Sequence, residues 1–179
     1  AISFDFIDLL TGSGISGSDY TEVLIGSKIQ INDASATGTY TIPVTDDALF
    51  EATETLICEI RNSTNGDVTI TTPSATADIY DNETATCDLS VTSQGDEEGP
   101  VNIIYSVTLS TVNNTGTSID FDFEDLLTGT ASSGNDYVAI GPAENISIPD
   151  GLSSGEFTIS VIDDNLFETI ENLNCLISN

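Results

Sequence analysis

The sequence has 179 residues, of which 30 are acidic and only 2 are basic, so its formal net charge is −28 at pH 7. Such a charge excludes nucleic-acid binders that work by charge attraction, because a polyanion repels phosphate. A hydrophobic fraction of 39% and a mean hydropathy of +0.05 are typical of a chain that folds around a packed core. No run of about 18 apolar residues is present, so we expect no direct insertion into a membrane.

Short segments with alternating apolar and polar residues recur along the whole chain. In chain order they cover residues 2–6, 40–44, 56–60, 75–79, 87–91, 101–109, 157–161 and 173–177. A period of two is typical of half-buried β-strands, and Thr, Val and Ile dominate these segments. No amphipathic helix is evident, so the pattern predicts an all-β fold in which sheets pack as sandwiches.

An internal repeat organises the chain. Residues 2–62 align without gaps with residues 119–179, and about half of the paired positions are identical. We therefore predict two tandem units, residues 1–83 and 84–179, with Asp81-Asn82-Glu83 at their junction. By this division the first unit lacks its first strands and the second lacks its last strand. Because open sheet edges would remain, we expect similar units on both sides.

Acidic residues cluster directly after one strand-like segment in each unit. They are Asp46, Asp47 and Glu51 in the first unit, and Asp163, Asp164 and Glu168 in the second, with Glu54 and Glu171 just beyond. Adjacent residues of a strand point to opposite faces, so neighbouring aspartates can converge only where the strand has ended. Like charges there would repel by roughly 4 kcal/mol per pair at 4 Å and an effective dielectric constant near 20. A bound cation would remove this repulsion.

Calcium is the cation that fits these residue types best. It takes 6–8 oxygen ligands from carboxylates and carbonyls in a flexible geometry. The chain has no histidine, which disfavours zinc, copper and iron sites. The sequence therefore predicts Ca²⁺ at the turns that carry the acidic residues, although solvated surface charge would produce the same pattern.

Two motifs that occur in both units resemble a known family. Gly17-Ser18-Asp19-Tyr20 recurs as Gly134-Asn135-Asp136-Tyr137, and each is followed by Asp-Asp-x-Leu-Phe-Glu-x-x-Glu. This combination resembles the Calx-beta domain, and the resemblance covers nearly the whole chain. It implies tandem immunoglobulin-like Greek-key β-sandwiches, each binding Ca²⁺ at one tip close to the junction with the next domain.

The resemblance also implies the ligands. Carried over by position, they fall on Asp19, Asp46, Asp47, Glu51, Asp81 and Glu83 in the first unit, and on Glu98, Asp136, Asp163, Asp164 and Glu168 in the second. Asn82 stands where many family members have another aspartate. Four further aspartates should lie on the solvent face of a strand, without a function, namely Asp5, Asp8, Asp122 and Asp125.

The chain has three cysteines, Cys58, Cys87 and Cys175. Cys58 and Cys175 occupy the same position in the two units, and the alternation places both with apolar neighbours. A Cys87–Cys175 disulfide across the sandwich would suit an exported protein. Buried free thiols that pack as small apolar residues are the alternative.

We interpret the chain as a structural or adhesive repeat segment of a large secreted or cell-surface protein, with calcium stiffening the junctions between repeats. The chain is also similar in character to the long repeat adhesins of gliding bacteria. Its partners would be neighbouring repeats, surface glycans or other cell-surface proteins. Two alternatives remain: a glycan- or protein-binding module that uses tip loops, and a calcium-sensing regulatory pair. Duplicated acidic turns without a histidine or a nucleophile motif do not indicate an enzyme.

Overall fold

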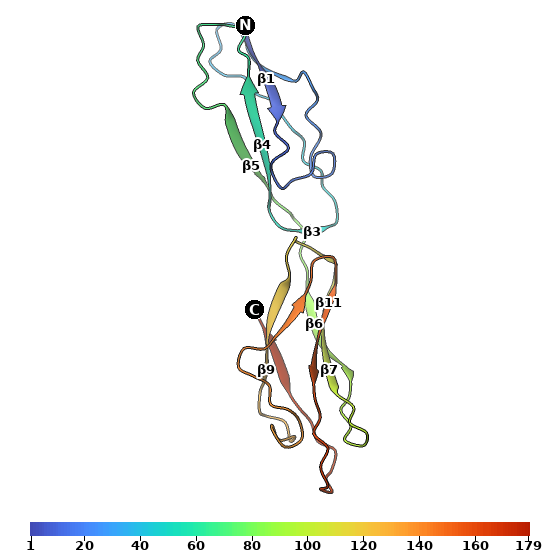
Figure 1. Ribbon diagram of the computed structural model, residues 1–179. Helices are drawn as coiled ribbons and strands as arrows, with labels where there is room; N and C mark the ends of the chain where they lie inside the picture. Colours follow the sequence, from blue (N-terminus) through green and yellow to red (C-terminus); the bar gives the residue numbers. More distant parts are fainter. The chain divides into compact units, whose positions relative to one another are not determined.

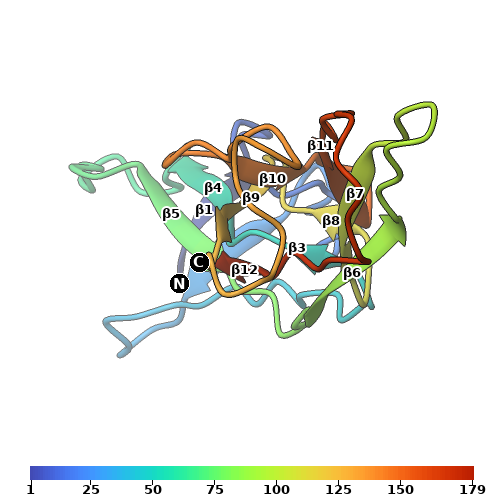
Figure 2. The same cartoon turned by 90° about the horizontal axis from the view of Figure 1, so that it is seen from below.

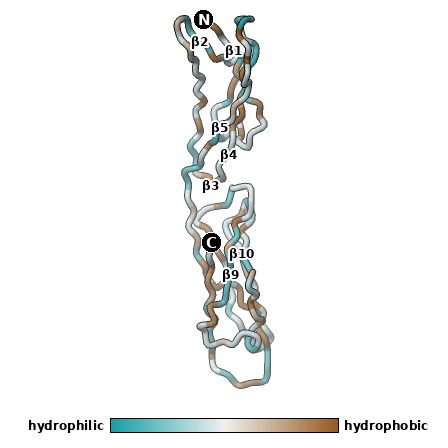
Figure 3. The backbone as a smooth tube through the Cα atoms, turned by 90° about the vertical axis from the view of Figure 1, so that its left-hand side faces the viewer, coloured by the Kyte–Doolittle hydropathy of each residue, from teal (hydrophilic) through white to brown (hydrophobic).

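The computed structural model describes residues 1–179 and contains strands, turns and loops, with no helix. The predicted all-β fold class is confirmed. The chain contains no helix that is long and apolar enough to cross a membrane. The apolar residues are spread along the strands in small groups (Figure 3), as the alternating sequence pattern requires.

The chain divides into two compact units. Unit 1 consists of Ala1–Ala48 and Ala52–Asn82, and unit 2 consists of Leu49–Glu51 and Glu83–Asn179. The short segment Leu49–Glu51 lies among the residues of the first sequence repeat but packs with unit 2. There its strand β3 (Phe50–Glu51) pairs in parallel with β8 (Asn113–Asn114).

Unit 1 contains one four-stranded antiparallel sheet. Its strand order is β2 (Lys28–Ile31), β1 (Ile2–Asp8), β4 (Glu54–Arg61) and β5 (Ser74–Ile79). Figure 1 shows β1, β4 and β5 side by side. Three apolar side chains of the unit are buried, namely Phe4, Tyr20 and Leu56.

Unit 2 contains two antiparallel sheets of three strands each. The first has the order β10 (Asn145–Ile148), β9 (Ile119–Asp125) and β12 (Cys175–Ser178). The second has the order β11 (Ser154–Ile159), β7 (Ile103–Leu109) and β6 (Cys87–Ser93). Figure 2 shows the two sheets of this unit as separate layers.

The core of unit 2 is built from side chains of both sheets. Its buried members are Tyr105, Val107, Leu109, Phe121, Phe123, Tyr137, Ile146, Ile148 and Ile159. The Phe123 ring packs between Tyr105 and Phe157, with centroid distances of 5.3 Å and 4.8 Å. Burial of alternating apolar side chains from two facing sheets is the packing of a β-sandwich.

One predicted strand is absent. Residues 40–44 alternate as a strand would, but they form no strand apart from an isolated bridge between Val44 and Tyr20. Of the repeat-related residues 157–161, the first three do lie in a strand, because β11 (Ser154–Ile159) pairs with β7 over six residues. The difference shows that alternation alone does not make a strand, since a strand also needs a partner edge.

The repeated Asp-Leu-Leu-Thr-Gly segment forms the same turn after β1 and after β9. The Asp8 carboxylate accepts a hydrogen bond from the Leu10 amide at 2.9 Å, and Leu10 has a φ of 53°. A glycine is required two residues later, because a Cβ at Gly12 would lie 2.0 Å from a backbone oxygen of β4. The turn therefore holds the end of β1 against β4.

Candidate metal centre

The Gly-x-Asp-Tyr motif forms a tight turn in both units. Gly17 and Gly134 have φ values of +87° and +86°, which is the left-handed region that favours glycine. The Gly17 amide donates to the Tyr20 carbonyl at 2.8 Å, and the Gly134 amide donates to the Tyr137 carbonyl at 2.9 Å. The same backbone geometry in two repeats means that the motif itself determines the turn.

The aspartate of each motif is oriented by hydrogen bonds at both its backbone and its side chain. The Asp136 carbonyl accepts a hydrogen bond from the Ile162 amide at 2.9 Å, and its Oδ2 accepts one from the Ser132 amide at 2.5 Å. In unit 1 the Ile15 amide donates to Asp19 Oδ2 in the same way. One carboxylate oxygen, Oδ2, thus helps to close the turn.

The tyrosine of each motif anchors the turn in the core. Tyr20 and Tyr137 are 1% and 2% exposed. The Tyr20 hydroxyl donates to Asp8 Oδ2 at 2.6 Å, and the Tyr137 hydroxyl donates to Asp125 Oδ2. Burial, followed by the hydrogen bond to the aspartate, raises the pKa of each tyrosine to about 12. Each tyrosine therefore stays neutral and remains a hydrogen-bond donor at neutral pH.

The prediction for Asp8 and Asp125 was therefore wrong. Both are half-buried, and each accepts hydrogen bonds from a tyrosine hydroxyl and from a backbone amide two residues ahead. The sequence did contain a signal, since both repeats keep the aspartate and the tyrosine at the same spacing.

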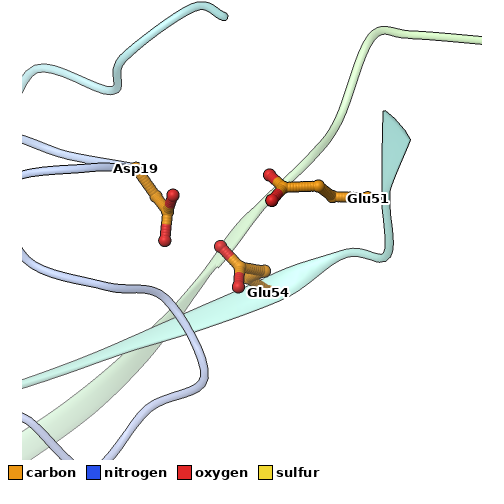
Figure 4. Close-up of side chains that lie close together, drawn as sticks. All are labelled: Asp19, Glu51 and Glu54. Atoms are coloured by element: carbon orange, nitrogen blue, oxygen red, sulfur yellow. The ribbon is translucent and has the colours of Figure 1, made fainter. Parts of the chain in front are cut away.

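Three carboxylates converge beside the first turn. Ligand-type oxygens of Asp19, Glu51 and Glu54 all lie within 4.8 Å of one another. Figure 4 shows the three carboxylates pointing toward one another, with Asp19 on a loop and Glu54 at the start of β4. None of the three is an exposed residue. We call this set the first triad.

The second triad is the repeat-related set in unit 2. It consists of Asp136, Glu168 and Glu171, whose carboxylate oxygens again lie within 4.8 Å of one another. Here Asp136 is half-buried, whereas Glu168 and Glu171 are exposed on the loop that precedes β12. The same three positions of the repeat therefore converge in both copies.

The two glutamates of the second triad have raised pKa values, in part because negative charges lie close together there. A hydrogen bond to Asp136 and partial desolvation, with the charges of Asp136 and Glu168, raise the pKa of Glu171. Desolvation, followed by the charges of Asp136 and Asp164, raises the pKa of Glu168. Glu97, from the loop between β6 and β7, adds to both shifts. The carboxylates therefore repel one another, and a bound cation would reduce this repulsion.

Comparison with known proteins identifies the family. The family profile described as Calx-beta domain matches residues 2–83 and 90–179. The chain belongs to the Calx-beta domain family. A solved structure described as "Crystal structure of CBD12 from CALX1.2" is 16% identical, with a TM-score of 0.38, and the match covers 99% of this chain and 66% of that one. A search of curated proteins finds no match.

The triads contain some of the residues expected as Calx-beta ligands and omit others. Four of the expected ligands lie in the triads, namely Asp19, Glu51, Asp136 and Glu168. Glu54 completes the first triad and Glu171 completes the second. Both glutamates were noted in the sequence but not assigned as ligands. The remaining predicted ligands lie outside the triads, and they are Asp46, Asp47, Asp81, Glu83, Glu98, Asp163 and Asp164.

Several of these residues have other contacts. Asp46 accepts a hydrogen bond from the Asn82 side chain at 3.2 Å. Asp164 accepts one from the Leu166 amide at 2.6 Å and adds charge beside Glu168. The Glu98 amide donates to the Asp96 side chain in the turn between β6 and β7, and Glu97 rather than Glu98 acts electrostatically on the second triad.

The cysteines of this Calx-beta chain are free thiols, and the Cys87–Cys175 disulfide is not formed. Cys87, which the predicted disulfide would place across the sandwich from Cys175, is exposed. Cys175 is half-buried and interacts with Tyr105, and burial raises the pKa of its thiol to about 11. The two side chains therefore have different environments, and neither faces the other as a bonding partner.

Proposed function

We propose that this chain binds Ca²⁺ at the two carboxylate triads and serves as a structural repeat segment of a larger extracellular protein. The observation that carries the proposal is the convergence of three repeat-related carboxylates within 4.8 Å, once in each copy. The same arrangement in both repeats argues against a chance meeting of surface acids. Membership of the Calx-beta family supports the same choice of ion.

The donor set fits calcium better than other cations. Each triad offers at least one oxygen from each of three carboxylates, and Ca²⁺ takes 6–8 oxygen ligands in a flexible geometry, from carboxylates, carbonyls and water. No histidine is present, and the thiols of Cys58 and Cys175 have raised pKa values because they are partly buried. Zinc and copper, which prefer imidazole and thiolate, find no such donors in the triads.

The chain's own residues perform three tasks at such a site. The glycine turn and the tyrosine anchor hold Asp19 and Asp136 in place before the ion arrives. Glu51, Glu54, Glu168 and Glu171 provide the charge. The bound ion would supply only positive charge, which removes the repulsion among the carboxylates. Binding restricted to the folded state then raises stability by RT ln(1 + [L]/Kd).

We propose further that calcium limits bending between successive repeats and so keeps an array of them extended at the cell surface. Calcium concentrations outside cells suit sites with dissociation constants of about 10⁻⁴ to 10⁻³ M. The net charge of −28 supports solubility and mutual repulsion along such an array. Partners would be neighbouring repeats, with glycans or cell-surface proteins as adhesion targets, and no catalytic activity is proposed.

Calorimetric titration of the full chain with calcium chloride tests the binding proposal. We expect binding that weakens at least about tenfold in Glu54→Gln and Glu171→Gln, each at its own site. Asp67→Asn and Asp120→Asn remove the same charge from exposed positions outside the triads, and both should bind like the wild type. A chain that releases no heat with millimolar calcium contradicts the proposal, as do control variants that lose as much affinity as the triad variants.

Scattering and binding assays separate the structural role from its alternatives. A stalk should become stiffer and longer with calcium in a chain of several repeats, while a glycan array stays blank. A specific glycan signal that disappears on exchange of residues 13–18 or 130–135 would favour a recognition module. Micromolar affinity with a large change of shape would favour a calcium sensor.

A further inference from the structure

The two basic residues of the chain both lie opposite one aspartate of unit 1. Asp5 belongs to β1, and its cross-strand partners are Lys28 on β2 and Arg61 on β4. Directly paired residues of an antiparallel sheet point to the same face. Arg61 forms an ion pair with Glu59, and Lys28 forms one with Asp5. The register of the sheet therefore places the only lysine of a chain with 30 acidic residues on one particular carboxylate.

The same carboxylate also binds a side-chain amide. Lys28 Nζ donates a hydrogen bond to Asp5 Oδ1 at 2.5 Å, and Asn62 Nδ2 donates one to Asp5 Oδ2 at 2.8 Å. The two oxygens of one carboxylate thus hold a primary amine and a primary carboxamide next to each other. The hydrogen bond from Lys28, followed by the one from Asn62, lowers the pKa of Asp5. Asp5 is therefore ionised at neutral pH and can accept a proton.

A turn after β4 brings the amide to this position. Asn62 follows the last residue of β4 and has a φ of 51°, in the left-handed region. A continued strand would direct its side chain to the face opposite that of Arg61. The turn is tied to β1, because the Ser3 amide donates to Thr64 Oγ1 at 2.9 Å and the Thr64 amide donates to the Ser3 carbonyl at 3.0 Å. The fold itself therefore holds the amide beside Asp5.

We propose that Lys28 and Asn62 form an intramolecular isopeptide bond, with Asp5 as the proton relay. Lys28 Nζ gives a proton to Asp5 and attacks Cγ of Asn62, so that the Nζ–Cγ bond forms while the Cγ–Nδ2 bond breaks. Two protons pass in turn from Nζ through Asp5 to Nδ2, which leaves as ammonium. Asp5 ends as the carboxylate, and a neutral amide replaces the charged lysine. The reaction needs no oxidant, cofactor or second protein, because the sheet already holds the reacting groups together.

The second repeat has the same arrangement without the nucleophile. Asp122 and Asn179 correspond to Asp5 and Asn62, but Asn145 stands in the place of Lys28. Asn145 pairs with Asp122 in the register in which Lys28 pairs with Asp5. Unit 2 therefore contains the relay and the amide but no amine, and it serves as an internal control.

The bond would fasten three strands of the sheet of unit 1. It joins the first residue of β2 to the residue after β4, and β1 lies between these strands. A covalent link between distant positions restricts the unfolded chain, as a disulfide does, and so raises stability. The side chains of Lys28 and Asp5 are 51% and 30% exposed. Water therefore favours the ion pair over the neutral amine and acid that react, and we expect the bond to form over days.

Mass spectrometry of the full chain, kept folded at neutral pH for several days, tests the proposal. We expect the intact mass to fall by that of one ammonia, and digestion at acidic residues to yield a branched peptide that joins Lys28 to Asn62. Lys28→Arg keeps the positive charge and should give no branched peptide. Asp5→Asn should slow its formation at least about tenfold, because the relay is lost. The matched control Asp122→Asn removes the corresponding carboxylate of unit 2 and should react like the wild type.

Three results would overturn the proposal. The first is a wild-type chain that keeps its mass and yields no branched peptide, which would leave Lys28 and Asp5 as an ordinary ion pair. The second is a loss of ammonia that persists in Lys28→Arg and maps to the exposed Asn65-Gly66, where ring closure onto the next amide gives the same mass change. The third is a branched peptide that forms equally fast in Asp5→Asn, which would exclude the relay. Bond formation is measured in the wild-type chain, so it does not depend on the folding of any variant.

Discussion

Removal of one hydroxyl group tests how the Gly-x-Asp-Tyr turn is held. In Tyr137→Phe the aromatic ring keeps its place in the core, where Tyr137 is 2% exposed, and the hydrogen bond to Asp125 is lost together with the interaction with Ser133. Asp125 retains its second contact, the hydrogen bond from the Leu127 amide at 2.8 Å. The main bond that the variant removes is the one between a neutral donor and a carboxylate.

The magnitude follows from the charge of the acceptor. Hydrogen bonds to charged groups contribute about 1.5–3 kcal/mol, and a half-buried carboxylate that keeps one donor should lie low in that range, at about 2 kcal/mol. In a unit of this size such a loss lowers the melting temperature by roughly 10 °C. Because Asp136 is adjacent to Tyr137, we also expect calcium affinity at the second triad to fall about tenfold.

Tyr105→Phe is the matched control. Its hydroxyl is also buried, with 6% exposure of the residue, but it donates to the neutral carbonyl of Leu173. We expect a loss of about 1 kcal/mol and unchanged calcium affinity. Calorimetric melting and calcium titration of both variants measure these effects. Equal losses of stability, or equal calcium affinities, would refute the argument that the carboxylate bond orients the metal-binding turn.

Three further predictions follow from the same contacts. Glu171→Gln should raise the melting temperature of the calcium-free protein and weaken calcium binding, because it removes a carboxylate whose pKa is raised by the neighbouring charges of Asp136 and Glu168; a loss of calcium-free stability in thermal melts would contradict this. The pKa of Tyr20 and of Tyr137 is raised to about 12 in the folded state, so their stabilising contribution is complete below pH 10 and is lost as the pH rises toward 12; denaturant titrations should show this fall, with a smaller fall in Tyr137→Phe. Ellman's reagent at pH 8 should modify Cys87 quickly and Cys58 and Cys175 only after unfolding, because burial raises the pKa of the latter two thiols; slow reaction at Cys87 would show that it is not free and exposed.

Much of the site could be predicted from local patterns, and the part that could not depends on convergence. Asp19 and Asp136 were found through a motif whose glycine and tyrosine fix the turn within six residues. Glu54 and Glu171 were visible as repeated acids, but only the direction of β4 and of the loop before β12 shows that they, and not Asp46 or Asp163, reach the motif aspartate. Sequence spacing does not specify how two loops meet.

By itself the sequence determined the all-β class, the repeat and the turn that presents the aspartate, because alternation and turn chemistry are local properties of the chain. Only the tertiary structure decided which neighbours those elements meet. It gave Asp8 and Asp125 a tyrosine to bind, turned Cys87 to the solvent, and left residues 40–44 without a strand for lack of a partner edge. The physical reason is that pairing and burial depend on groups far apart in the chain, about which local periodicity carries no information.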